Sequence, residues 1–381
     1  MSDFFAFESL TWPEVAGLRR DTPLVLPLGG GYDLGKLSES LGEPGNIGLL
    51  PAFPYGWIGS DLPVSAGVLS AYIGNLLESL RDDGFSRVFC LAPAGVGLGL
   101  GTAEIHQPIR ETDASRRPWA AENARSKVVI IPIGHTEQHG LHLPLCVDTR
   151  IIEAIAQGVV NDQPLQSVSL PVMPYGVSTH RSDFSGTMNA GGRAFEDFYL
   201  EVIERLVQQG FDRFYIISGH GGNSSFLVNV VKYAGDRHRN IFCATAWLYL
   251  SGPDGVAALE KHRLSKIGGM GHACELESAL MLHLKPELVH MERVVDETAF
   301  IATPSYYMDW IEGGALIANP SWTDDTRTGA YGAGSLATAE HGRIWLEAAV
   351  QEKVKHIAEI HEQQERRRSE ERRVGKECLS S

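Results

Sequence analysis

Cysteine is scarce in this sequence, and the pattern of the few cysteines excludes two classes of protein. The chain of 381 residues has five cysteines, scattered and odd in number, and no two of them stand in a Cys-x-x-Cys pair. Neither a disulfide framework nor a thiolate metal site is therefore expected. A reducing cytoplasm is the expected compartment.

Long apolar runs and an excess of positive charge are also missing. No segment approaches the roughly 20 consecutive apolar residues that a transmembrane helix needs. The N-terminus, MSDFFAFESLTWPEV, has neither the basic region nor the apolar core of a signal peptide. The formal net charge is −14, so nucleic acids and anionic membrane surfaces would repel the chain, and neither is an expected partner.

The composition is that of a globular protein, and the length allows more than one domain. Hydrophobic residues make up 43% and charged residues 21% of the chain, without a long low-complexity block. The chain is long enough for two or three average domains, or for one large domain with an appendage.

An internal repeat sets the domain organisation. The segment LPAFPYGW (50–57) returns as LPVMPYGV (170–177), and LLESLRDDGFSRVFCLAPAGVG (76–97) returns as VIERLVQQGFDRFYIISGHGGN (202–223). Upstream, TPLVLPLGGGYD (22–33) is similar to KVVIIPIGHTEQ (127–138). Three matches in the same order indicate a duplicated unit with insertions in its loops.

The first copy lacks polar residues that the second copy has. Tyr32 and Leu34 stand where the second copy has Glu137 and His139, and Ala94 replaces the histidine of SGHGGN. The first copy is therefore interpreted as a degenerate, partial version of a catalytic unit that keeps the shape and not the chemistry.

We expect four parts along the chain. They are a degenerate non-catalytic half repeat, a polar linker, a catalytic domain, and a charged tail that is disordered or not native: residues 1–100, 101–118, 119–362 and 363–381.

Short β-branched runs alternate with longer amphipathic segments in the second copy. The expected strands are residues 127–133, 168–173, 213–218 and 241–247, and the expected helices are residues 149–160, 194–209, 224–235, 274–284 and 336–362. Strands that are apolar on both faces are typical of a parallel sheet covered by helices on each side. We expect an α/β fold: a three-layer α/β/α domain with a mostly parallel central sheet, preceded by a smaller α/β copy.

Polar side chains follow two of the expected strands. Glu137 and His139 come directly after KVVIIPIG, and their i, i+2 spacing puts both on one face of an extended chain. Asp148 stands just before a helical pattern, and His220 stands in the glycine-rich exit GHGGN of the strand RFYIIS. Since the carboxyl ends of parallel strands form the ligand crevice of such sheets, these side chains are expected to meet.

A third set of polar residues opens the amphipathic segment GHACELESALML (271–282). It contains His272, Glu275 and Glu277, and Glu275 lies three residues after His272, so the two would point similarly on a helix. Imidazole and carboxylate groups without thiolates suit Zn²⁺, Mn²⁺ or Fe²⁺.

Each of these residues taken alone also has a structural interpretation. A single histidine after a strand is more often a hydrogen-bonded loop residue, and Glu275 or Glu277 is more often a solvated or helix-terminal charge. The three motifs together, in this order, favour a metal site. No serine stands in a nucleophile-elbow sequence, and LGGGYDLG (28–35) precedes no P-loop lysine, so nucleotide binding is not indicated.

These motifs resemble those of the creatininase (creatinine amidohydrolase) family, in its HGGN and HAGE form. GHTEQHGLHLPLCVD is similar to the N-terminal metal motif, SGHGGN to the second metal motif and HACELES to the HAGExET motif. FSGT is similar to the FPGT loop and AEHGR to the C-terminal segment, so the resemblance spans about residues 118–360.

The resemblance implies two divalent metal ions per active chain, zinc or manganese, with iron(II) as a further candidate. By matching position, Glu137 and His220 would bind one ion, His139 the other, and Asp148 would bridge the two. In creatininase proper the fifth ligand is a glutamate two residues after the second-motif histidine, where this chain has Gly222. Members with the HGGN form use the glutamate of the HAGE motif instead, which is Glu275 here.

The same resemblance assigns catalytic and substrate-binding roles. His272 matches a proton shuttle, and Glu277 matches a residue behind the metal ligands. The substrate loop STHRSDFSGT (178–187) departs from the usual SPEHLGFPGT, and its His180 and Arg181 are expected to contact substrate.

Three further residues are expected beside the substrate. Gly221 and Gly222 belong to the HGGN turn, and Trp247 lines up with an active-site tryptophan of creatininase. A buried core tryptophan explains Trp247 equally well.

The implied function is that of a metal-dependent hydrolase. A hydroxide activated by two metal ions would cleave an amide-type C–N bond of a small polar or cyclic substrate. One alternative keeps the metals and opens the ring of a ketocyclitol by C–C hydrolysis, as a dehydro-inosose hydrolase does; His180 and Arg181 would suit such a hydroxyl-rich substrate. A non-catalytic scaffold is a third hypothesis, against which the intact second ligand set argues.

The degenerate copy is expected to act in assembly, because the resemblance implies a homo-oligomer. A second hypothesis is that it covers the pocket with Tyr55 or Trp57, although both are more simply core residues of that unit.

Overall fold

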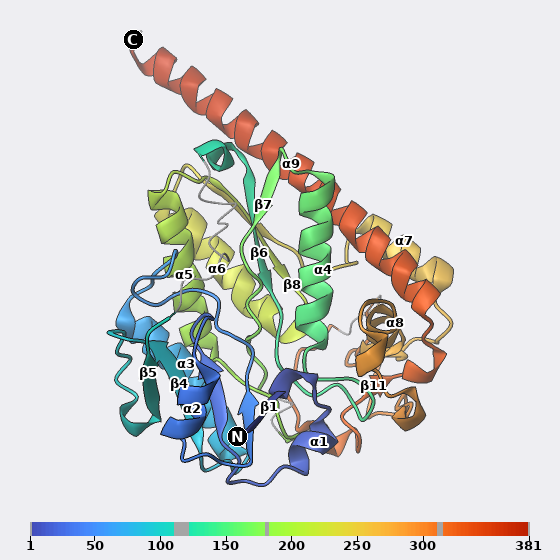
Figure 1. The fold of residues 1–381 in the computed structure, drawn as a ribbon. Coiled ribbons are helices and arrows are strands. Elements are labelled where there is room, and N and C mark those ends of the chain that lie inside the picture. The colour runs from blue at the N-terminus through green and yellow to red at the C-terminus, as the bar shows by residue number, and fades with distance from the viewer. Residues whose placement is uncertain (1, 110–121, 180–182, 311–314, 380–381) are drawn as a thin grey trace.

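The computed structural model describes residues 2–109, 122–179, 183–310 and 315–379, and it is an α/β structure built on two parallel sheets (Figure 1). The N-terminal unit and the C-terminal unit each contribute one of these sheets. The predicted α/β class is confirmed.

The N-terminal sheet has five strands in the order β1-β3-β2-β4-β5, and all neighbouring strands are parallel. The strands are β1 (Asp3–Ala6), β2 (Leu24–Pro27), β3 (Asn46–Leu49), β4 (Val88–Pro93) and β5 (Glu104–Gln107). The helices of this unit are α1 (Trp12–Ala16), α2 (Leu34–Ser40) and α3 (Ala66–Asp82).

The C-terminal sheet has four parallel strands in the order β7-β6-β8-β9. The strands are β6 (Val128–Ile133), β7 (Ser167–Ser169), β8 (Arg213–Ser218) and β9 (Phe242–Thr245), and a separate antiparallel pair is formed by β10 (Met270–His272) and β11 (Tyr331–Gly332). The helices are α4 (Val147–Asp162), α5 (Gly192–Gln208), α6 (Ser224–Arg237), α7 (Pro253–His262), α8 (Glu275–Leu284) and α9 (Ala339–Leu379).

Alternate residues of β6 enter two different hydrophobic cores, which places helices on both faces of this sheet. Val129 and Ile131 pack into the core that contains α5, whereas Val128 and Ile130 pack into the core that contains α4, α8 and α9. A strand that is apolar on both faces needs such double cover. The C-terminal unit therefore has three layers, with α5 and α6 on one face of the sheet and α4 and α9 on the other (Figure 1).

The two sheets have the same strand order and the same register where the sequence repeat aligns them. β3-β2-β4-β5 in the first corresponds to β7-β6-β8-β9 in the second. Corresponding pairs across the sheets are Leu24–Val88 with Val129–Phe214, and Leu28–Phe53 with Ile133–Met173. These parallels support the inference of a duplicated unit.

The two units share one hydrophobic core, at which α3 packs against α5. The ring centroids of Tyr72 in α3 and Phe198 in α5 are 5.0 Å apart, and the Tyr72 hydroxyl donates a hydrogen bond of 2.9 Å to the Tyr175 carbonyl. Tyr55 and Trp57 belong to this core and do not line the pocket described below. The structure therefore places them as core residues and not as a lid.

Two predicted boundaries are corrected by the structure. Residues 104–107, assigned to the linker, form the edge strand β5, whose alternate side chains Ile105 and Gln107 are covered while His106 faces outward. Residues 363–379, expected as a separate tail, continue helix α9. Among the described residues, no helix is both long and apolar enough to cross a membrane.

The shared core makes a prediction about the dependence of the C-terminal unit on the N-terminal one. Tyr72→Ala should lower the free energy of unfolding by about 3 kcal/mol, since large-to-small changes at buried aromatic positions leave a cavity. Tyr233, a tyrosine of α6 that is 56% exposed, provides the control: Tyr233→Ala should change stability by about 0.5 kcal/mol or less. Denaturant unfolding of the full chain measures both, and equal effects would contradict the shared core.

Candidate metal centre

Two glycines at the strand ends allow the first turn of α4 to approach the sheet. A Cβ atom on Gly134, just after β6, would lie 2.4 Å from the Thr149 Cα, and one on Gly219, just after β8, would lie 2.2 Å from the Asp148 carbonyl oxygen. No other residue type fits at such distances. Asp148 in the first turn of α4 is thereby held directly against the ends of both strands.

Six side chains predicted from the sequence meet at this point, and all are nearly inaccessible to solvent. Each is at most 4% exposed. They are Glu137, His139, Asp148, His220, His272 and Glu277.

Asp148 lies between two halves of this cluster. Its Oδ1 is 3.2 Å from the Nε2 of His139, and its Oδ2 is 3.3 Å from the Nδ1 of His220. Glu137 Oε1 lies 3.1 Å from the same His220 nitrogen, and Glu277 Oε1 lies 3.8 Å from the His139 nitrogen. The two carboxylate oxygens of Asp148 therefore face different halves of the cluster: Oδ1 faces His139 and Oδ2 faces His220.

Main-chain carbonyl groups fix which nitrogen of each imidazole faces the cluster. A carbonyl oxygen only accepts, so the ring nitrogen beside it must carry the proton. His139 donates from Nδ1 to the Glu137 carbonyl, His220 from Nε2 to the Val177 carbonyl, and His272 from Nε2 to the Gln138 carbonyl. In a neutral ring the opposite nitrogen then holds the lone pair, and it is this nitrogen that faces the carboxylates.

The charges of the cluster shift the pKa values of its members. Burial alone would lower the pKa of the His139 imidazole, but Asp148 and Glu277 outweigh burial and raise it well above its usual value. Burial acts on His220 in the same sense, and Glu137 and Asp148 raise its pKa to about 9. Burial would raise the pKa of Asp148, yet His139 and His220 lower it. The cluster thus favours the charged form of Asp148 with cations beside it.

Glu275, predicted as the fifth ligand, does not reach the cluster. Its Oε1 accepts a hydrogen bond from the Leu264 amide and its Oε2 one from the Ser265 amide, at 2.9 and 2.8 Å. The expectation from its spacing to His272 is wrong because His272 lies on β10 and the helix begins only at Glu275. Glu277, expected behind the ligands, lies in the cluster itself, beside His139 and Asp148.

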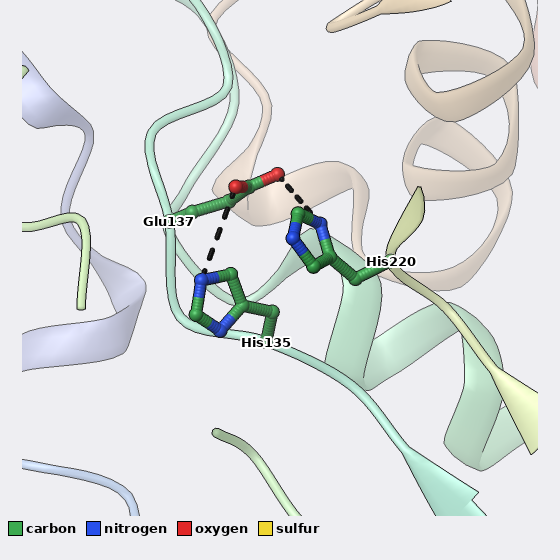
Figure 2. Close-up of side chains that lie close together, drawn as sticks. All are labelled: His135, Glu137 and His220. Carbon is green, nitrogen blue, oxygen red and sulfur yellow. Dashed lines mark ion pairs between the residues drawn. The ribbon is translucent and has the colours of Figure 1, made fainter. Parts of the chain in front are cut away.

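A further histidine, His135, was not singled out from the sequence. It is buried, its Nε2 faces Glu137 Oε2 at 3.9 Å, and its ring lies 4.5 Å from that of His220 (Figure 2). The signal was available, because His135, Glu137 and His139 alternate along an extended segment and share one face.

The donor set fits divalent cations. Three groups of three side chains bring ring nitrogen and carboxylate oxygen atoms within 4.8 Å of one another: His135 with Glu137 and His220, Glu137 with His139 and His272, and His139 with Asp148 and Glu277. Within the described part of the chain, the buried His139 Nε2 and Asp148 Oδ2 make no hydrogen bond. Imidazole nitrogens anchored by carbonyl groups, beside carboxylates, are the usual surroundings of zinc and manganese.

A cavity of about 630 Å³ opens over the cluster. Trp247, which is 55% exposed and therefore not a core residue, lines it together with Gly221 and Gly222. His180 and Arg181 lie outside the described residues. Lining residues that the sequence did not indicate include Phe226, Tyr306, Met308, Trp310, Ile317 and Trp322, and the polar Ser225, Asp309 and Asn319.

The fold and this site define a hydrolase of the metal-dependent kind, and comparison with known proteins gives the family. Residues 114–357 match the model of the family Creatininase, described as creatinine amidohydrolase. The chain therefore belongs to the creatininase family.

The relatives of this chain carry names that imply hydrolysis of different bonds. The chain is 30% identical over 240 residues to the mycofactocin precursor peptide peptidase of Mycobacterium ulcerans, which covers 60% of this chain and 84% of the relative. It is 26% identical to the creatinine amidohydrolase of Pseudomonas putida, covering 59% and 86%. It is 28% identical to the 3-dehydro-scyllo-inosose hydrolase of Thermotoga maritima, covering 62% and 78%.

The fold is also that of solved creatininases. The structure named "Creatininase Mn" superposes with a TM-score of 0.52 at 24% identity, covering 63% of this chain and 95% of that one.

Gly222 makes a prediction that tests how His220 is held. A Cβ atom on Gly222 would lie 2.4 Å from both the His220 Nε2 and the Val177 carbonyl oxygen. Gly222→Ala should therefore displace His220 from its anchor and reduce bound zinc or manganese by at least one ion per chain.

Gly221→Ala is the matched control, since the nearest atoms to a Cβ at that position are 4.0 Å away. Elemental analysis after metal loading measures both variants. Equal metal contents would show that the hydrogen bond between His220 and Val177 is dispensable.

Proposed function

We propose that this protein is a two-metal hydrolase that cleaves an amide-type C–N bond, with a peptide or other substituted amide as substrate. One observation carries the proposal: Asp148 presents one oxygen to each of two imidazole–carboxylate halves, directly beneath a cavity of substrate size. A scaffold would not need three carboxylates buried together, because buried charge is costly unless it is compensated.

The charges of the cluster balance when two divalent ions are present. Glu137, Asp148 and Glu277 would bring three negative charges and two divalent ions four positive charges, so one further bound anion would make the sum zero. The sum of charges is the same whether Glu277 or Glu275 is taken as the third carboxylate. A neutral sum suits side chains that are at most 4% exposed.

The residues of the chain have separate tasks in the reaction. Bound zinc or manganese would lower the pKa of water and polarise the substrate carbonyl. His272 lines the pocket, and the Gln138 carbonyl holds its Nε2–H, so Nδ1 is the atom that would accept a proton and deliver it to the leaving nitrogen. Aromatic side chains over the cluster would limit the access of bulk water to the substrate.

The lining of the cavity favours an amide over a hydroxyl-rich ring. Trp247, Trp310 and Trp322 line it with Tyr306 and Met308, and no lysine or arginine is among the described lining residues. Flat apolar walls suit the acyl or side-chain groups of a substituted amide, and Thr179, Ser225, Asp309 and Asn319 supply the polar part of the lining. A ketocyclitol remains the second candidate because of the relative from Thermotoga maritima.

Compartment and assembly belong to the proposal as well. Cys90, Cys146, Cys243 and Cys274 are free thiols, which supports a reducing cytoplasm. A homo-oligomer is proposed from the family resemblance.

Metal removal and a substrate panel test the proposed function. Protein treated with a chelator should lose hydrolysis of unblocked and amidated dipeptides, and zinc or manganese at two ions per chain should restore it. Ring opening of ketocyclitols without amide hydrolysis would favour the second candidate. A chain that retains activity after complete metal removal would contradict the proposal.

The identity of the fifth ligand is tested by a pair of isosteric variants. Glu277→Gln should reduce the metal content by about one ion per chain and lower kcat/KM by at least ~100-fold, in the range for loss of a group that holds the reacting centre. Glu275→Gln should keep both ions and mainly lower thermal stability, because its carboxylate holds the amides of Leu264 and Ser265. The reverse pattern would restore Glu275 as the ligand.

A further inference from the structure

His135 lies under the half of the cluster formed by Glu137 and His220 and is fully buried. The Gly176 amide donates a hydrogen bond of 2.9 Å to its Nδ1. An amide N–H only donates, so Nδ1 must hold the lone pair and Nε2 must carry the proton of the neutral ring. This is the opposite of a ligand orientation, because the nitrogen that faces the cluster bears hydrogen.

Gly176 and Val177 thus orient two neighbouring imidazole rings in opposite senses. Because the Gly176 N–H donates to its Nδ1, His135 presents an N–H group to the cluster. Because its Nε2 donates to the Val177 carbonyl, His220 presents a nitrogen lone pair to the cluster. The rings of His135 and His220 lie 4.5 Å apart and are inclined by 32°. Asn223 secures this loop by accepting from the Val177 amide at 2.9 Å.

The protonated nitrogen of His135 points at Glu137. Figure 2 shows the Glu137 carboxylate facing both rings; its Oε1 lies 3.1 Å from the His220 Nδ1 and its Oε2 lies 3.9 Å from the His135 Nε2. The first copy of the repeat has Gly30 at the position of His135 and Tyr32 at that of Glu137, so the two residues are absent together.

We propose that His135 is the positioning residue of the Glu137–His220 half-site: its Nε2–H is directed at Glu137 Oε2 across 3.9 Å, beyond hydrogen-bond length, and orients this carboxylate electrostatically, which leaves Oε1 and the His220 Nδ1 to bind one metal ion. This rests on the proposed two-metal function. A neutral donor orients the carboxylate without adding a charge or competing for the ion. Partners of this kind behind metal ligands contribute about 10–100-fold to metal affinity.

Two substitutions separate the two ring nitrogens of His135. Gln places its amide N–H near the position of Nε2 and keeps the donor to Glu137, whereas Asn places its oxygen near Nδ1 and keeps only the acceptor for Gly176. His135→Asn should weaken the binding of one of the two zinc ions by roughly 10–100-fold and leave the other unchanged. His135→Gln should stay within a few-fold of the wild type.

His142→Asn is the control for loss of a buried histidine from the same segment. His142 contacts the Ser278 hydroxyl at 2.8 Å and does not face the cluster. It should bind both ions as the wild type does. Zinc titration against a competing chelator dye gives the two affinities, and thermal unfolding of the metal-free proteins shows what each variant costs the fold.

The wild-type chain offers a measurement that needs no variant. Cadmium-loaded protein with isotope-labelled histidine should show metal–nitrogen coupling at the His139 Nε2 and the His220 Nδ1, and none at His135. Coupling at His135 would make it a ligand and overturn the inference.

The outcomes separate this inference from the function on which it rests. If the wild type binds two ions and His135→Asn also binds both with unchanged affinity, only the role of His135 is overturned. If His135→Asn retains affinity better than His135→Gln, His135 acts through the Gly176 loop alone, which also overturns it. A wild type that binds no metal ion overturns the proposed function together with the inference.

Discussion

The site depends on the contact between the first turn of α4 and the ends of two parallel strands. Gly134 and Gly219 have no side chains, so the backbone at Asp148 and Thr149 lies against both strand ends. Only this approach puts one carboxylate between residues that follow β6 and a residue that follows β8. Strand ends of an α/β sheet commonly form a crevice. Here the first turn of α4 lies so close to two strand ends that the Asp148 side chain fills the space between them.

The N-terminal unit shows that the sheet does not require the site. Its strands have the order and register of the second sheet, yet Gly29 lies against the Trp57 ring and Pro93 stands at the position of Gly219. Asp33, after β2, accepts hydrogen bonds from the first turn of α2 and serves as the cap of that helix. The candidate site therefore depends on a few residues that follow the strands. The N-terminal unit lacks these residues and still contributes its strands to the shared hydrophobic core.

The sequence predicted the second sheet and most of the cluster because both depend on short-range patterns. β6 and β8 coincide with apolar runs, and Glu137, His139 and His220 follow them directly. Such short-range patterns could not predict whether Glu275 or Glu277 faces the cluster. Successive residues of a helix are about 100° apart, so these two point in nearly opposite directions, and the backbone before the helix decides which one faces the cluster. Ala273, with φ of 49°, turns the chain between His272 and the start of α8. His272 and Glu275 therefore do not share one helix face, as the prediction had assumed. The strand β5 was missed for a related reason, since an edge strand with polar residues has little hydrophobic pattern.

The direction of each pKa shift connects the fold to the proposed chemistry. The carboxylates around them raise the pKa of the His139 and His220 imidazoles against the effect of burial, and those imidazoles lower the pKa of Asp148. The protein has therefore enclosed negative charge that must be balanced by cations at fixed positions, either protons on the rings or metal ions between them. Protons satisfy each ring separately, whereas a metal ion binds two or three side chains at once. The carbonyl groups that fix the rings leave lone pairs converging from different elements, and that convergence is useful only to an ion that can take several ligands.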